Sequence, residues 1–204
     1  SHRLCVAPMM DITDKHCRFF HRLLAPNSRL YTEMIAANAV LRGDTARLLE
    51  FDSRESPVAL QLGGSDPKML AIASRIGSEI GYEEINLNCG CPSKRVVSGN
   101  FGASLMQSPN LVADCVKAMI DSSANLVTVK HRLAIDQNED YGFTHKFVET
   151  VESAGCRLFI VHARNAFLGG LSPKKNRVVP PVKMHFVKQL KKDFPNSSFI
   201  ANGG

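Results

Sequence analysis

The amino-acid sequence predicts an α/β fold, an incomplete TIM (β/α)8 barrel, from two observations. Short apolar runs with strand character alternate with segments whose apolar residues recur at helical spacing, which indicates a parallel sheet. Nearly every predicted strand is also followed by a polar or conformationally special residue. A doubly wound sheet gathers its ligand groups near one switch point. Here such groups follow all the predicted strands, as a TIM barrel requires.

The predicted strands and helices are spread along the whole chain. The strands are expected at 4–7, 30–32, 58–62, 84–87, 126–129, 158–161 and 198–201. Helical spacing is found at 69–76, 111–120, 143–151 and 182–190. Asp66 and Ser108 each stand before a proline, so both are predicted to be helix N-caps.

Side chains suited to binding or catalysis come at the strand ends. They are Pro8 and Met9 after the first strand, Glu33 after the second, Gln61 in the third, Asn88 and Cys91 after the fourth, Lys130 and Arg132 after the fifth, His162 and Arg164 after the sixth, and Asn202, Gly203 and Gly204 after the seventh. Any one of these residues could simply be a polar residue that ends a strand. That interpretation does not account for such residues at the ends of so many consecutive strands.

The turn after strand 84–87 is the most informative single feature. Gly90 and Pro92 end the strand and hold Cys91 on a sharp turn beside Asn88. A thiol in that position is placed for proton transfer or nucleophilic attack. The alternative is that Cys91 is a small buried apolar residue, which is the usual state of a free cysteine.

Length and composition predict one domain, 1–204, with no metal site. The chain has 204 residues, whereas a TIM barrel typically has about 250. Because it stops at Gly204, we expect the eighth strand to be missing and the strand edges at 4–7 and 198–201 to favour aggregation. No apolar run is long enough to span a membrane, and scattered cysteines argue against zinc and disulfides. We expect a reducing, cytoplasmic location, with an organelle left open.

The basic residues are unevenly distributed. The net charge is +6, and between 157 and 204 the only acidic residue is Asp193. This bias suits a polyanionic partner. We interpret Lys174, Lys175 and Arg177 as phosphate contacts, because they lie in a long loop after a strand end. Lys188, Lys191 and Lys192 are instead interpreted as a solvated helix face.

Motifs in order along the whole chain resemble one known family. They are VAPMMDITDKHCRFF at 6–20, LYTEM at 30–34, PVALQLGGSDP at 57–67, EINLNCGCPSKRV at 84–96, GNFGASLM at 99–106, VTVKHR at 127–132, FIVHAR at 159–164, GLSPKKNR at 170–177 and NGG at 202–204. Together they resemble the tRNA-dihydrouridine synthases, most nearly the bacterial A type.

The resemblance implies a flavin-dependent TIM barrel followed by a helical tRNA-binding domain. Such enzymes reduce uridines of the tRNA D-loop, at positions 20 and 20a in the A type, with bound FMN and with NADPH as reductant. By matching motif, Cys91 is expected to be the general acid and Asn88 to hold the target uracil. We also expect a monomer with no metal and no membrane association.

The remaining site residues also follow from the resemblance. Pro8, Met9, Gln61 and Lys130 are expected to contact the isoalloxazine ring, His162, Asn202, Gly203 and Gly204 the ribityl-phosphate end, and Arg132, Arg164, Lys174, Lys175 and Arg177 the tRNA. A lysine beside the pyrimidine ring of the flavin would stabilise the anion of its reduced form.

The chain departs from the family pattern at a few positions. Cys89 stands where an aliphatic residue is usual, and because alternate strand residues face opposite ways, we expect it to be packed while Asn88 faces the site. Ile12 replaces a frequent Trp, and Asn165 and Phe167 replace a frequent Lys and Trp.

Three alternatives remain at this point. A flavin barrel acting on a free pyrimidine would share the lysine and the glycine loop, but not the Cys91 turn or the basic C-terminal stretch. A catalytically silent RNA-binding module would not need Cys91, Lys130 and His162. The third alternative is a non-functional fragment.

Overall fold

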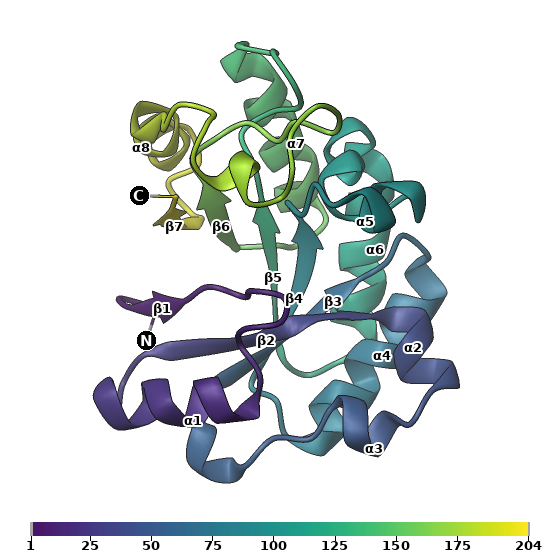
Figure 1. Cartoon of the computed structure of the whole chain (residues 1–204). Helices are drawn as coiled ribbons and strands as arrows, with labels where there is room; N and C mark the ends of the chain where they lie inside the picture. Colours follow the sequence, from purple (N-terminus) through teal and green to yellow (C-terminus); the bar gives the residue numbers. More distant parts are fainter. Residues whose placement is uncertain (1, 204) are drawn as a thin grey trace.

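The computed structural model describes residues 2–203, and its parallel strands follow one another across the sheet in chain order (Figure 1). The strands are β1 Cys5–Val6, β2 Arg29–Ala36, β3 Val58–Gly63, β4 Glu84–Cys89, β5 Leu126–His131, β6 Leu158–His162 and β7 Ser198–Asn202. All seven predicted strands are confirmed, and most extend one or more residues beyond their predicted ends. The fold is therefore the predicted α/β class, an incomplete TIM barrel.

The sheet is curled but open. Within residues 2–203 each strand pairs only with its sequence neighbours, and no pairing joins β1 to β7. Figure 1 shows the two edge strands on the same side of the molecule, with a gap between them. Of the two edges, β1 is the shorter, with two residues.

Helices and short 3-10 turns connect the strands. They are α1 Lys15–Leu24, α2 Ala37–Arg42, α3 Thr45–Leu48, η1 Ser53–Glu55, α4 Pro67–Ile80, α5 Lys94–Ser98, η2 Gly102–Gln107, α6 Pro109–Ser122, α7 Tyr141–Ser153, η3 Lys175–Arg177 and α8 Met184–Asp193. The helical segments predicted from apolar spacing are confirmed as α4, α6, α7 and α8. None of the helices in the described part of the chain is both long enough and apolar enough to cross a bilayer.

Both predicted N-cap positions are confirmed, and one of the two is capped by its own side chain. The Asp66 carboxylate accepts hydrogen bonds from the amides of Lys68 and Met69, so it caps α4 as expected. Ser108 also occupies the N-cap position of α6, directly before Pro109, but its side chain makes no capping hydrogen bond. The preceding turn η2 ends at Gln107, and the Ser108 amide donates to Leu105 O (2.9 Å) within that turn. Ser108 therefore closes η2 and begins α6 at the same residue.

The main hydrophobic core lies between the sheet and its helices. In β4, Ile85, Leu87 and Cys89 are fully buried in this core, which also contains Leu70 of α4 and Val116 of α6. Burying a side chain such as Leu or Ile contributes about 1.5–3 kcal/mol to folding.

The concave face of the sheet is much more polar than the outer face. The alternate residues of β4 are Glu84, Asn86 and Asn88, which are also buried. Only a small apolar cluster, built on Tyr31, Ala59 and Ile160, is separate from the main core. The inner face therefore consists largely of hydrogen-bonding side chains that lead toward the carboxyl ends of the strands.

Candidate active site

A cavity of about 490 Å³ lies at the carboxyl ends of the strands, within the size range typical of ligand pockets. Among the residues that line it are Pro8, Met9, Gln61, Asn88, Cys91, Lys130, Arg132, His162, Lys174 and Arg177, all of them site residues predicted from the sequence. They come from segments that are far apart in the chain. The parallel strands bring them together because every carboxyl end lies at the same rim of the sheet.

The Cys91 turn is held by hydrogen bonds at both sides. Asn88 Oδ1 accepts from the amides of Gly90 (3.0 Å) and Cys91 (2.9 Å), and Cys91 O accepts from the Ala103 amide (2.9 Å). Gly102 has a φ of 68°, and a Cβ there would lie 2.6 Å from Cys91 O. Only glycine fits this close approach, so the backbone of the turn holds Cys91 at a fixed place on the cavity wall.

The two neighbouring thiols face different surroundings. Cys91 is half-buried and lines the cavity, with its Sγ 3.6 Å from Ser93 Oγ. Cys89 has no exposed surface and packs in the main core, which confirms the expectation from strand alternation. Burial raises the pKa of the Cys89 thiol well above its ordinary value. Cys91 is therefore the thiol available to a ligand.

Lys130 carries a positive charge into the cavity without a carboxylate partner among residues 2–203. Its Nζ donates to Asn202 Oδ1 at 3.3 Å. Burial, and then the nearby Arg132 guanidinium, lower the pKa of Lys130 to about 8. Lys130 is thus a cation at neutral pH that an anionic ligand would stabilise.

His162 is a neutral, buried imidazole with an unused nitrogen. It is 7% exposed, and its Nε2 has no hydrogen-bond partner within the described residues. Burial, followed by the charges of Arg132 and Lys130, lowers the pKa of His162 to about 2. Gly203 has a φ of 109°, and a Cβ there would lie 2.5 Å from His162 Cδ2. Glycine therefore allows the last strand end to approach the ring closely.

Arg132 connects the Cys91 turn to the long loop after β6. Its Nε donates to Gly90 O (3.3 Å), and its Nη1 donates to Asn165 O (3.2 Å) and Asn176 O (2.9 Å). The side chain is 3% exposed, and burial is the main cause that lowers its pKa to about 10. Arg132 lines the cavity as expected, but several of its N–H groups are already hydrogen-bonded to backbone carbonyls of the protein.

Asn176 organises that long loop and was not predicted from the sequence. Its side chain is completely buried; Oδ1 accepts from the Phe167 amide (2.8 Å), and Nδ2 donates to Phe167 O (3.0 Å). The same Nδ2 also approaches Leu171 O and Ser172 O. Nothing in the local pattern distinguishes Asn176 from an ordinary exposed loop residue. Its effect is to hold the exposed Lys174 and Arg177 at the rim of the cavity.

Other predicted site residues lie beside this cavity rather than on its wall. Arg164 Nε donates to Gly203 O (3.1 Å), and its Nη1 donates to Val178 O (3.3 Å). Lys175 is exposed at the start of η3. Asn202 lines a smaller neighbouring hollow together with Lys130. The predicted cofactor contact Gly204 lies outside the described residues.

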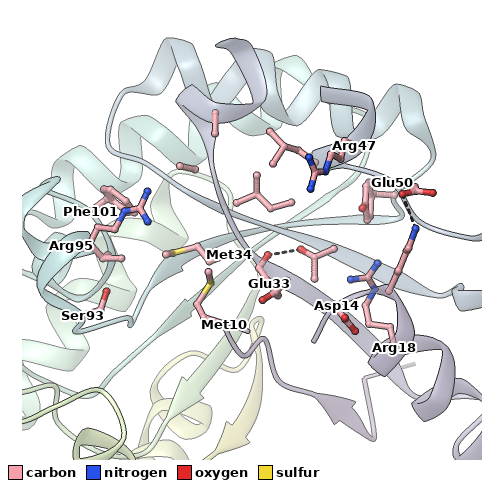
Figure 2. Close-up of a pocket in the computed structure, with 18 residues that line it drawn as sticks. Met10, Asp14, Arg18, Glu33, Met34, Arg47, Glu50, Ser93, Arg95 and Phe101 are labelled. Carbon is pink, nitrogen blue, oxygen red and sulfur yellow. Dashed lines mark hydrogen bonds and ion pairs between the residues drawn. The ribbon is translucent and has the colours of Figure 1, made fainter. Parts of the chain in front are cut away.

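A larger cavity of about 770 Å³ adjoins the first one. Figure 2 shows Arg47 and Arg95 on opposite sides of it, and Met10, Met34 and Ser93 line both cavities. Glu33, which the sequence placed after the second strand, lines this larger cavity, whereas its other walls come from segments such as α1 that the sequence did not single out. We take the smaller cavity as the candidate active site, since it gathers the groups from the strand ends.

The charge of the smaller cavity favours an anionic ligand. Its wall contains Lys130, Arg132, Lys174 and Arg177, against the single carboxylate Asp11. Clustered positive charge in a low-dielectric hollow attracts anions such as phosphate. Among residues 2–203 no group of three or more His, Cys, Asp or Glu side chains could hold a metal ion.

Two solved structures have a fold similar to that of this chain. The chain is similar to 2,3-dimethylmalate lyase, a PEP mutase/isocitrate lyase superfamily member, with a TM-score of 0.58 and 13% identity over 97% of this chain and 63% of that chain. It is similar to a putative lyase/mutase from Burkholderia cenocepacia J2315, with a TM-score of 0.55 and 14% identity over 100% of this chain and 77% of that chain. At such low identity the likeness concerns the fold alone.

Much more similar sequences are found among curated proteins. A protein of Xanthomonas axonopodis pv. citri named tRNA-dihydrouridine(20/20a) synthase is 57% identical over 99% of this chain and 60% of that protein. The proteins of the same name from Synechocystis sp. and Pseudomonas aeruginosa are 58% and 55% identical, over 60% and 61% of their lengths. This chain thus spans about three fifths of the length of these relatives.

The family profile described as "Dihydrouridine synthase (Dus)" matches residues 5–204, nearly the whole chain. The match includes every strand described above and the Cys91 turn. The chain therefore belongs to the dihydrouridine synthase family.

Proposed function

We propose that the chain is the flavin-binding catalytic part, 1–204, of an enzyme that reduces uridine in tRNA to dihydrouridine, with FMN bound and NADPH as reductant. One observation carries the proposal: a half-buried thiol, Cys91, lies on a fixed turn in the same positively charged cavity as Lys130 and His162. The names of the relatives support tRNA as substrate and positions 20 and 20a as the targets.

The cavity fits FMN in three respects. The unpartnered Nε2 of His162 is a hydrogen-bonding group that a ribityl-phosphate chain would satisfy. Gly203 leaves room beside that ring, where a Cβ would collide. Lys130 has no carboxylate partner among residues 2–203 and would stabilise negative charge at the pyrimidine edge of the flavin. Pro8, Met9 and Gln61 complete the wall that would face the isoalloxazine ring.

The overall reaction is uridine + NADPH + H⁺ → dihydrouridine + NADP⁺. When bound, FMN would supply the redox chemistry, the transfer of a hydride equivalent from NADPH to uracil C6, and Lys130 and His162 would help to hold it. Asn88 holds the uracil with the N–H of its amide that Gln61 does not use. The Cys91 Sγ–H donates the proton to C5, and a proton from solvent restores the thiol. The fixed turn keeps this donor in place through the reaction.

A free pyrimidine is the alternative substrate, and the loop after β6 favours tRNA over it. Lys174 and Arg177 are exposed side chains that line the same cavity. Exposed cations there suit the phosphates of a polynucleotide. A monomer in the cytoplasm stays a prediction of the sequence.

The proposed function is tested by spectroscopy and by analysis of tRNA. Purified protein should show the absorbance of bound flavin, lose it when NADPH is added, and produce dihydrouridine in tRNA that lacks the modification. Turnover of free uridine or UMP at the rate found with tRNA would favour the alternative substrate. Protein that binds no flavin would contradict the proposal.

Replacing both Lys174 and Arg177 by Ala should weaken tRNA binding without changing the flavin content. Each phosphate contact releases counterions, so the slope of log K against log salt concentration should become shallower by about 1 to 2. The matched control replaces the exposed Lys188 and Lys192 of α8, which has the same change of charge on a solvated face. Equal effects of the two pairs in a salt titration would show that only net charge matters.

A further inference from the structure

A line of hydrogen bonds runs along the concave face of the sheet from the start of β4. At its lower end the carboxylate of Glu84 accepts from Thr128 Oγ1 (2.7 Å) and from Tyr31 OH (2.9 Å). Thr128 Oγ1 in turn accepts from Asn86 Nδ2 (2.7 Å). Glu84, Asn86 and Thr128 have no exposed surface, and none of them lines the candidate active site.

The line continues upward to the Cys91 turn. Asn86 Oδ1 accepts from Gln61 Nε2 (2.7 Å), and Gln61 Oε1 accepts from Asn88 Nδ2 (2.8 Å). Asn88 Oδ1 then accepts from the amides of Gly90 and Cys91. The strand register makes this possible, because Gln61, Asn86 and Thr128 are directly paired positions of β3, β4 and β5.

The two ends of the line determine the direction of every bond between them. A side-chain amide by itself can be held either way round, since its oxygen and nitrogen have nearly the same shape. The carboxylate of Glu84, which lies 3.6 Å from Arg29 Nε, only accepts. The backbone amides of Gly90 and Cys91 only donate. Traced from either end, each side chain can donate only to one neighbour and accept only from the other. Both tracings place the amide oxygens and nitrogens of Asn86, Gln61 and Asn88 in the same orientation.

We infer that Glu84, Thr128 and Asn86 are positioning residues that hold the amide of Gln61 from the side away from the cavity, in the orientation that matches the one the Cys91 turn imposes on Asn88. In this orientation Gln61 and Asn88 each keep one N–H free for a ligand. Carbonyl oxygens are the acceptors that these groups would meet. That the carbonyls belong to flavin and uracil rests on the proposed function, whereas the orientation of the amides does not.

The test is Thr128→Val in the whole chain, with Thr144→Val as matched control. Both threonines are completely buried, but Thr144 Oγ1 donates to Leu133 O, outside the line. The measurement is solvent exchange of the side-chain amide protons of Asn86, Gln61 and Asn88, by NMR on ¹⁵N-labelled protein without flavin or tRNA. Tyr31→Phe is a second control, because Thr128 still reaches Glu84 in that variant.

Thr128→Val should accelerate amide exchange at Gln61 as well as at Asn86, by about tenfold, the size expected for one lost hydrogen bond. Asn88 should stay protected, because the amides of Gly90 and Cys91 still hold it. Thr144→Val and Tyr31→Phe should leave these protons as in the unmodified protein. Loss of protection at Asn86 alone, or an equal loss in Thr144→Val, would overturn the inference. If Thr128→Val does not fold, Thr128→Cys takes its place, because a thiol is only a weak acceptor.

A second measurement separates this inference from the proposed function. In flavin-loaded protein, Thr128→Val should lower kcat while the KM for tRNA stays unchanged, because the contacts of Lys174 and Arg177 are untouched. A change in KM with kcat unaltered would contradict a positioning role. If the unmodified protein reduces no uridine, the proposed function fails, and the exchange experiment still decides the orientation of the amides.

Discussion

Cys91→Ala is expected to abolish most uridine reduction while flavin binding and reduction by NADPH remain normal. Only protonation at C5 loses its donor, and general acid catalysis typically contributes about 10²- to 10⁴-fold to a rate. The loss should appear in single-turnover formation of dihydrouridine from pre-reduced protein and tRNA. The rate at which NADPH bleaches the flavin absorbance should be the same as in the unmodified protein.

Cys89→Ala is the matched control for that substitution. Its thiol has no exposed surface and lies two residues away in the core. We expect turnover close to normal, together with a modest loss of stability from the small cavity that the substitution leaves. If Cys89→Ala lost as much turnover as Cys91→Ala, the assignment of the acid to Cys91 would be wrong.

Lys130→Met is expected to slow flavin reduction by about 100-fold, the effect of removing one positioned group that stabilises developing negative charge. The midpoint potential should fall by about 60 mV, the two-electron equivalent of that factor. Stopped-flow mixing with NADPH and a potentiometric titration measure the two quantities. Lys183→Met is the control, since Lys183 is also largely buried but is paired with Glu139 outside the cavity.

The lowered pKa of Lys130 should make the affinity for reduced FMN depend on pH. Because that pKa is lowered to about 8, the flavin-free protein loses this cation as the pH rises through 8. Affinity for reduced FMN, which is anionic, should therefore decrease between pH 7 and 9. The decrease should be absent in Lys130→Met, whose affinity is already low at pH 7. A parallel pH profile in both proteins would remove Lys130 from the flavin site.

The fold was predictable because its signals are local. Period-two and helical spacing identified every strand and the helices α4, α6, α7 and α8. Helix α1 was missed because its buried side chains include Arg18 and Arg22. Arg18 forms an ion pair with the buried Glu55 (2.5 Å). A charged residue in a sequence is ordinarily interpreted as exposed, and only the distant partner makes its burial possible.

In the candidate site, too, local features were predictable from the sequence and long-range contacts were not. Residues at the strand ends could be expected to meet, because parallel strands place their carboxyl ends together. The buried Thr128 and Asn176 could not, because each acts through contacts with segments far along the chain. Arg132 illustrates the difference: its position in the wall of the cavity was expected, but its hydrogen bonds to Gly90, Asn165 and Asn176 depend on the folded loops.

The buried side chain of Asn176 has a consequence for the kinetics of association. A loop that is ordered only when RNA arrives loses conformational entropy at that moment, which weakens binding. Here the protein's own hydrogen bonds through Asn176 and Arg132 cross-link the loop. Lys174 and Arg177 therefore belong to a rigid surface, and the encounter with a polyanion is governed by diffusion and long-range attraction rather than by folding of the loop.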